Sequence, residues 1–213
     1  MRSHLYVTDL TSNLYTVDPA TGSAGLVGPT GMASITDIAF HGPTLYGVTF
    51  SKLVRLNPDT GAAVAVGSPF SYSTNGLAVS EEGTIYAGTT GTTNGELITI
   101  NPVTGVATLV GHFGAGMTSG GDLAFDNNGV LYGALNQNGV FVLAKINRTT
   151  GAATVIGPIG FNNVYGLAIH CCRFFGGTSA GELLALNAAT GQGTLIGKNT
   201  VYIGGMSARP CCC

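Results

Sequence analysis

The chain has 213 residues, a net charge of −2 and only 8% charged residues, against 45% apolar residues and 34 glycines. This composition is too apolar for a disordered chain, and its glycine content favours turn-rich β-structure over helices. The scattered Lys and Arg residues form no basic stripe, which argues against a nucleic-acid partner, and no apolar run is long enough to cross a membrane.

The chain opens with a short apolar strand followed by a hairpin. Residues 4–10, HLYVTDL, are mostly apolar, and residues 16–28, TVDPATGSAGLVG, place two apolar segments around a Pro-Ala-Thr-Gly turn. In such a turn Asp or Asn opens an Asx-turn, Pro fixes φ at about −65°, and Gly takes the left-handed conformation. The hairpin recurs at residues 55–67, 100–111, 145–157 and 185–197. A repeat of about 43 residues is typical of a propeller or a solenoid.

A second motif alternates with the hairpin. Residues 37–48, DIAFHGPTLYGV, form an apolar strand, a tight polar turn and a strand with an aromatic residue before Gly, and similar patterns follow at residues 76–88, 122–134 and 166–177. Together the two motifs give four strands per repeat, the size of a propeller blade. In the first strand large residues alternate with a column of small ones, which lets each sheet bury both faces between its neighbours. The small residues are Ala39, Ala78, Ala124, Ala168 and Ser207.

The two ends of the chain complete one blade. Residues 204–209 resemble the first strand of the repeat, and residues 4–10 resemble the second. We therefore predict an all-β, five-bladed β-propeller with four antiparallel strands per blade, closed by a C-terminal strand joined to the N-terminal strands. A solenoid or an open sandwich is the alternative. Residues 1–213 form one domain with predicted blades at 204–210 plus 4–28, 37–67, 76–111, 122–157 and 166–197.

The repeated stretch between residues 4 and 209 resembles the LYxIDPxTGxxTxIG units of secreted bacterial propellers of unassigned function and, more distantly, the NHL and quinoprotein-type propellers. The five-bladed count is also similar to that of the tachylectin lectins. The resemblance implies a secreted or cell-surface location, although no apolar signal-peptide core follows Met1. The chain has no Trp, so the tryptophan-docking signature of quinoprotein propellers is missing, and we expect no cofactor.

Two carboxylates, Asp37 and Asp122, stand at the start of predicted innermost strands, which line the central channel of a propeller. Together they could hold a cation or act as an acid–base pair. The alternative, which we favour, is that each caps backbone amides between blades, where the other repeats have Gly76, Gly166 and Gly205. No nucleophile elbow, zinc-protease motif or phosphate loop occurs in the sequence.

The loops of one predicted face vary and are rich in aromatic and amide side chains, almost without charge. Such a surface suits a neutral polar ligand such as a sugar or an extended peptide. The alternative is that the aromatic side chains plug the channel mouth or pack between blades. The candidate ligand-binding residues are Phe70, Tyr72, Asn75, Phe113, Phe161, Asn162, Asn163, Tyr165 and Tyr202.

Five cysteines fall at two places that ring closure brings together. Cys171 and Cys172 occupy a tight turn of the fifth repeat, and residues 211–213 follow the last strand at the equivalent position. With His170 beside them, Cys171, Cys172 and Cys211 form a candidate zinc or copper(I) site. A disulfide between the tail and the turn, or an inert tail, is the alternative; a disulfide requires Cα atoms within roughly 7 Å.

These observations favour a monomeric, non-catalytic binding module that recognises a neutral carbohydrate or a peptide through the loops of one face. Two alternatives remain: an enzyme of the lactonase or lyase kind that uses a channel cation, and a structural propeller domain of a surface protein. The enzyme would need a histidine and several carboxylates at the channel mouth, whereas strand counting places His4, His41 and His170 on the opposite face. We therefore expect no catalytic activity.

Overall fold

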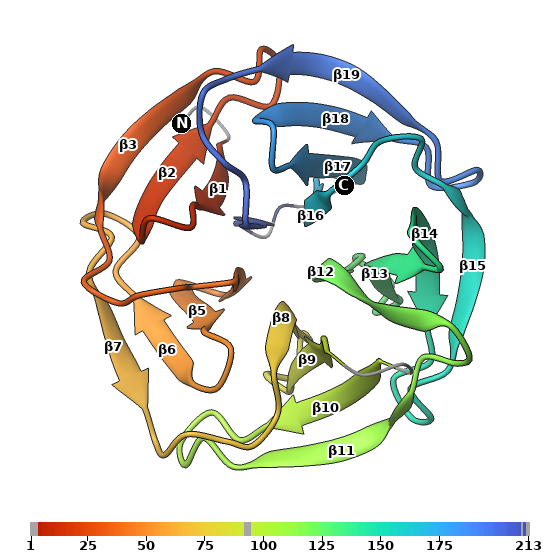
Figure 1. The fold of residues 1–213 in the computed structure, drawn as a ribbon. Coiled ribbons are helices and arrows are strands. Elements are labelled where there is room, and N and C mark those ends of the chain that lie inside the picture. Colours follow the sequence, from red (N-terminus) through yellow and green to blue (C-terminus); the bar gives the residue numbers. More distant parts are fainter. Residues whose placement is uncertain (1–3, 92–94, 210, 212–213) are drawn as a thin grey trace.

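The computed structural model describes residues 4–91, 95–209 and 211 and shows five four-stranded antiparallel sheets arranged as blades around a central axis (Figure 1). The described residues contain no helix, and hence none long enough to span a membrane. The predicted all-β, five-bladed propeller is confirmed. Residue 210, which the prediction assigned to the first blade, lies outside the described residues.

Each blade runs from an innermost strand at the axis to an outermost strand at the rim (Figure 1). In that order the strands of the five blades are β20 (Gly205–Ala208), β1 (Leu5–Thr8), β2 (Asn13–Val17) and β3 (Ala24–Pro29); β4 (Asp37–His41), β5 (Thr44–Val48), β6 (Leu53–Leu56) and β7 (Ala63–Val66); β8 (Thr74–Val79), β9 (Ile85–Thr89), β10 (Glu96–Ile100) and β11 (Ala107–His112); β12 (Met117–Phe125), β13 (Leu131–Gln137), β14 (Val140–Ile146) and β15 (Ala153–Pro158); and β16 (Val164–His170), β17 (Arg173–Thr178), β18 (Glu182–Leu186) and β19 (Gly193–Lys198).

Strands from both ends of the chain close the ring. β20 pairs antiparallel with β1, with Met206 opposite Val7, so the C-terminal strand becomes the innermost strand of the blade that the N-terminal strands begin. Each of the other blades consists of four strands that are consecutive in the sequence. The predicted closure is therefore confirmed, and the edge of β1 that would otherwise be open is paired.

The small residues of the innermost strands share buried clusters with large residues of the next blade. These pairs are Ala39 with Leu77, Ala78 with Leu123, Ala124 with Leu167 and Ala168 with Met206. At the fifth junction the hydroxyl of Ser207 accepts a hydrogen bond from the amide of Phe40 at 3.1 Å. The predicted column of small residues thus allows neighbouring blades to pack face to face.

At the rim, each hairpin touches the hairpin of the next blade through a glycine. A Cβ atom at Gly157, in β15, would overlap the carbonyl oxygen of Thr190 in the following turn. The next residue, Gly191, has a φ of 80°, which a turn glycine adopts without strain. Such contacts occur at all five junctions, namely Gly28–Thr60, Gly67–Thr104, Gly111–Thr150, Gly157–Thr190 and Gly197–Thr21. One glycine of the repeat therefore shapes the turn, and the other permits close approach between blades.

The fourth blade departs from its predicted boundaries. β12 begins at Met117 instead of residue 122, because its first residues pair with the lengthened end of β13 before a register break that follows Ser119. Asn138 and Gly139, with φ of 52° and 90°, join β13 to β14. This left-handed pair is typical of a two-residue hairpin turn. Residues 135–137, which lie beyond the motif predicted at residues 122–134, therefore belong to β13.

Candidate functional site

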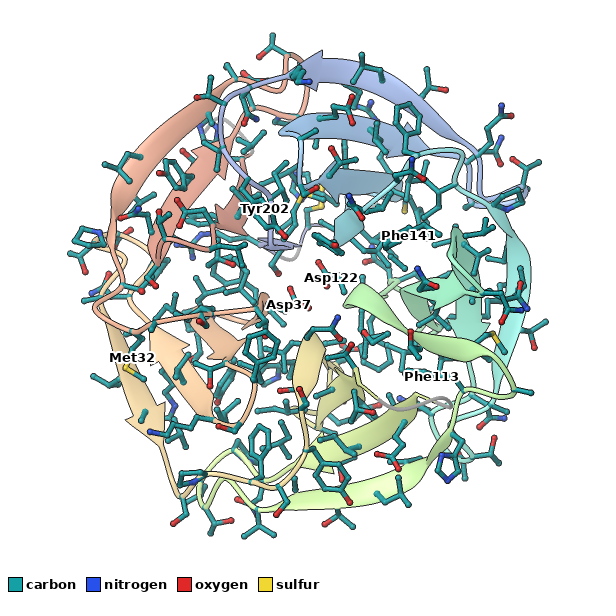
Figure 2. The ribbon with its side chains drawn as sticks, in the orientation of Figure 1. Met32, Asp37, Phe113, Asp122, Phe141 and Tyr202 are labelled. Carbon is teal, nitrogen blue, oxygen red and sulfur yellow. A yellow bond between two sulfur atoms is a disulfide. The ribbon has the colours of Figure 1, made fainter. Side chains whose placement is uncertain are left out.

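The two aspartates predicted at the channel lie at the centre of the ring (Figure 2). Asp37 begins β4, Asp122 lies in β12, and both side chains are fully buried. The carboxyl group of Asp37 accepts the N–H of Ile38 at 2.7 Å and the N–H of Leu77, in the next blade, at 2.5 Å. Asp37 therefore links the innermost strands β4 and β8.

Asp122 links two further blades. Its Oδ2 accepts the N–H of Leu167, in β16, at 2.6 Å and the N–H of Met206, in β20, at 3.0 Å. Glycines stand at the remaining axial positions; at Gly205 a Cβ would crowd the backbone of Asp37. The carboxyl groups face amide donors, which is the arrangement expected of caps between blades and is unfavourable for a cation.

Burial raises the pKa of both carboxyl groups well above the ordinary range, and for Asp37 the charge of Asp122 adds to the increase. With both groups ionised, Oδ1 of Asp122 would be a buried oxygen that receives no hydrogen bond from the described residues. Two contacting carboxylates in a buried site cannot both be charged at low cost. We therefore expect the pair to retain one proton.

One predicted ligand-binding residue, Phe113, is a core residue instead. Its side chain is only 1% exposed and lies in a buried cluster with Leu97 and Leu123. The backbone amide of Phe113 donates to Gly95, and its carbonyl accepts from Ala153, so hydrogen bonds on both sides hold this segment between two blades. A ligand on the loop face cannot reach this ring, and the expectation is corrected.

Three other predicted residues make contacts within or between blades. Phe70 and Tyr72 pack partly buried against a core cluster and, with Thr104, line a small cavity of about 230 Å³. Asn75 donates to the carbonyl of Ser119 at 3.3 Å and so bridges β8 and β12. These contacts agree with the alternative in which the aromatic side chains pack between blades. The side chains of Phe70 and Tyr72 nevertheless remain partly exposed to solvent.

A second group of predicted residues comes together near the channel mouth. The rings of Tyr165 and Tyr202 lie 6.0 Å apart between centroids with an interplanar angle of 31°, and Tyr202 projects close to the axis (Figure 2). The hydroxyl of Tyr165 donates to the side-chain oxygen of Asn163 at 3.3 Å. Asn162 and Asn163 are exposed. The preceding residue, Phe161, is partly buried against a core cluster. Burial and the neighbouring Tyr165 raise the pKa of Tyr202 to about 12, so this surface stays neutral at physiological pH.

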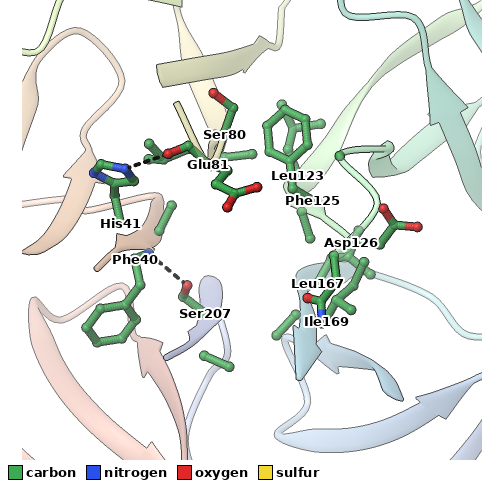
Figure 3. A pocket seen from close by; sticks show the side chains of 18 of the residues that line it. Phe40, His41, Ser80, Glu81, Leu123, Phe125, Asp126, Leu167, Ile169 and Ser207 are labelled. Atoms are coloured by element: carbon green, nitrogen blue, oxygen red, sulfur yellow. Dashed lines mark hydrogen bonds between the residues drawn. The ribbon is translucent and has the colours of Figure 1, made fainter. Parts of the chain in front are cut away.

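A cavity of about 640 Å³ lies at the opposite ends of the innermost strands, between the turns that follow them (Figure 3). Its wall includes the whole column of small residues, Ala39, Ala78, Ala124, Ala168 and Ser207. The sequence contained this signal, because small side chains on every innermost strand leave space near the axis. From the sequence we assign the column only to packing between blades, and the cavity is not predicted.

The rim of this cavity is acidic, and several of its polar groups already have partners. Arg148 lies 3.6 Å from Glu82, and Nε2 of His41 lies 3.1 Å from the carbonyl oxygen of Glu81 (Figure 3). The carboxylate of Asp126 accepts backbone N–H groups of its own turn. His41 is thus on the side opposite to the aromatic loops, as strand counting predicted.

The cysteine turn and the C-terminal tail meet as ring closure predicted. Cys171, in the turn between β16 and β17, forms a disulfide with Cys211, which follows β20; their Cα atoms are 5.4 Å apart. The ring of His170 touches both sulfur atoms, with Nε2 3.4 Å from Sγ of Cys171 and Nδ1 3.3 Å from Sγ of Cys211. Cys172 shares the turn, and the last two cysteines lie outside the described residues.

No protein-family model and no curated protein matches the sequence. Among solved structures, the chain is similar to one in the crystal structure of a nidogen/laminin complex, with a TM-score of 0.66, 12% identity and coverage of 100% of this chain and 83% of that chain. It is also similar to the PQQ-bound form of aldose sugar dehydrogenase from Streptomyces coelicolor, with a TM-score of 0.51, 18% identity and coverage of 74% of this chain and 60% of that chain. At these identities the likeness shows the propeller fold alone.

Proposed function

We propose that this protein is a monomeric, non-catalytic binding module that recognises a neutral carbohydrate or an extended peptide through the loops of one face. The observation that carries the proposal is the uncharged pair of Tyr165 and Tyr202 with the exposed amides Asn162 and Asn163 beside it. Half-buried tyrosine rings offer apolar contact area at low entropic cost, and amide groups supply directional hydrogen bonds. A neutral ligand suits this surface because no charge has to be desolvated or paired.

The axis supports a non-catalytic role. The enzyme alternative required Asp37 and Asp122 around a channel cation, but both carboxyl groups are fully buried and accept backbone amides. The carboxylate oxygens of Asp37 and Asp122 are therefore inaccessible to a substrate. The similarity to a sugar dehydrogenase does not restore this alternative, since it concerns the fold only.

The cavity at the opposite ends of the innermost strands is a second candidate for the ligand site. Its volume of about 640 Å³ lies within the range of small-molecule pockets, and the small side chains of the innermost strands form part of its wall. The rim carries Glu81, Glu82 and Asp126 against Arg148, so it favours a cationic ligand over a neutral one. The charge of the ligand therefore distinguishes the two sites.

Glycan and peptide arrays probed with the purified protein test the proposal. We expect a neutral ligand whose binding is lost in the double variant Tyr165→Ala/Tyr202→Ala, while the melting temperature stays close to that of the parent. Tyr72→Ala is the matched control from the other aromatic group, and Glu81→Gln/Glu82→Gln tests the cavity rim. Loss of binding in the rim variant alone moves the ligand to the cavity, and the absence of any array ligand contradicts the proposal.

A further inference from the structure

We infer that the reduced protein binds one zinc ion through His170, Cys171 and Cys211. One ligand atom from each residue lies within 4.8 Å of the other two, although the residues come from the end of β16, the turn after it and the tail after β20. In the oxidised form the two sulfur atoms are joined as a disulfide. The inference therefore concerns the protein after the disulfide has been reduced.

The distance from the imidazole of His170 to the sulfur atom of Cys171 matches that of a zinc centre. Zn–S bonds of about 2.3 Å and Zn–N bonds of about 2.0 Å in a tetrahedron place N and S ligand atoms roughly 3.5 Å apart. Here Nε2 of His170 lies 3.4 Å from Sγ of Cys171, which matches this spacing. Sγ of Cys211 lies 3.3 Å from the other ring nitrogen, Nδ1, so it has to move toward Nε2 to bind the same ion. Reduction breaks the bond between the two sulfur atoms and so releases Cys211, which follows the last strand, from Cys171.

The surroundings of His170 orient its ring in the way that metal-binding histidines require. The side chain is only 9% exposed, and Nδ1 lies 3.3 Å from the carbonyl oxygen of Arg209. When Nδ1–H donates to that carbonyl, the tautomer is fixed and the lone pair of Nε2 faces the thiol of Cys171. Three protein ligands leave one position of a tetrahedral zinc ion for water, and Cys211 lines the 640 Å³ cavity.

Charge favours zinc over copper(I). A divalent ion with two thiolates and a neutral imidazole gives a neutral centre, whereas copper(I) leaves a net negative charge in a partly buried site. The two arginines nearest in sequence stack on aromatic rings. The guanidinium group of Arg173 lies 5.1 Å from the ring centre of Phe175, and that of Arg209 lies 5.0 Å from the ring centre of Phe40. Reduction of the disulfide by a phosphine supplies two electrons and takes up two protons, and each thiol then releases its proton as zinc binds.

The test measures zinc binding anaerobically by competition with a chromogenic chelator, with stoichiometry from metal analysis. We expect one zinc per phosphine-reduced chain, much weaker uptake by the oxidised chain, and a thiolate-to-metal charge-transfer band when cobalt(II) replaces zinc. His170→Ala should weaken zinc binding at least ~10-fold. His41→Ala is the matched control, because His41 ends β4 as His170 ends β16 but lies against a carbonyl of Glu81. This control should bind zinc like the parent.

Three results would overturn the inference. The first is equal zinc affinity in the His170→Ala and His41→Ala variants. The second is parental affinity in Cys171→Ser/Cys211→Ser, which would assign the metal to other cysteines. The third is tight copper(I) binding with no measurable zinc. Should His170→Ala fail to fold, Cys211→Ser alone decides the matter, since this residue lies outside the strands.

Discussion

At the scale of single residues, Asp37 and Asp122 receive backbone amides from the innermost strands of several blades. Gly205, at another axial position, leaves room for Asp37. A proton between them avoids two buried negative charges, and it makes the fold sensitive to pH.

We predict that the stability of the protein falls as the pH rises above about 4. The pKa of the pair is raised in the native state, so the native protein keeps a proton that an unfolded Asp releases near pH 3.9. The stabilisation is complete below that pH and is lost as the pH rises through the native pKa, by up to ~1.4 kcal/mol per unit. Urea unfolding at about pH 5, 7 and 9 measures the slope.

Asp122→Asn should reduce this slope, because it removes the second carboxylate whose charge adds to the raised pKa of Asp37, while the burial of Asp37 remains. The carbonyl oxygen of Asn at this position can still accept the N–H groups of Leu167 and Met206. Asp126→Asn, in a turn at the cavity rim, is the control and should keep the parental slope. A parent protein with constant stability across this pH range would contradict the shared proton.

The role of the aspartates was predictable from the sequence, whereas the position of Phe113 was not. The repeats align Asp37 and Asp122 with glycines, which indicates a shared backbone site with little room for side chains. Phe113 looks like any aromatic residue in a variable loop. Its burial depends on backbone bonds to two blades that the local sequence does not reveal.

At the scale of elements, we predict that Gly157→Ala destabilises the protein by ~1–3 kcal/mol, because the new methyl group forces β15 away from the turn of the next blade. Gly25→Ala, in β3, is the matched control, since its Cβ would meet nothing closer than Oγ1 of Thr16 at 3.6 Å. Neither glycine has a positive φ, so the pair separates close approach from backbone strain. Equal unfolding free energies for the two variants would refute the role of the contact.

The strands were predictable because each repeat carries its own turn signals. The extension of β12 and the cavity were not, for a physical reason common to both. Strand pairing beyond the repeat depends on the length of the partner β13, and the width of the axial space depends on how five blades pack together. Neither quantity is encoded in one repeat.

At the scale of the whole molecule, removal of residues 204–213 should cost more than ~3 kcal/mol. The truncation deletes β20, exposes the edge of β1 and empties the buried site of Met206. The full-length variant Cys171→Ser/Cys211→Ser lacks the Cys171–Cys211 disulfide but keeps the strand, so it separates the two contributions. It should lose ~2–4 kcal/mol. A truncated protein that unfolds at the same urea concentration as this variant would show that β20 adds nothing to closure.

The pairing of β20 with β1 also has a consequence for biosynthesis. A ribosome makes the chain from the N-terminus, so β1 emerges before the other strands of the propeller and its partner β20 emerges after all of them. Until then the opening blade has three strands and an unpaired edge, which can pair with a neighbouring nascent chain. The other four blades can each assemble as soon as their own strands leave the ribosome, whereas the blade of β1 to β3 stays incomplete until β20 has been made. Chaperone protection during synthesis would therefore matter most for β1 to β3.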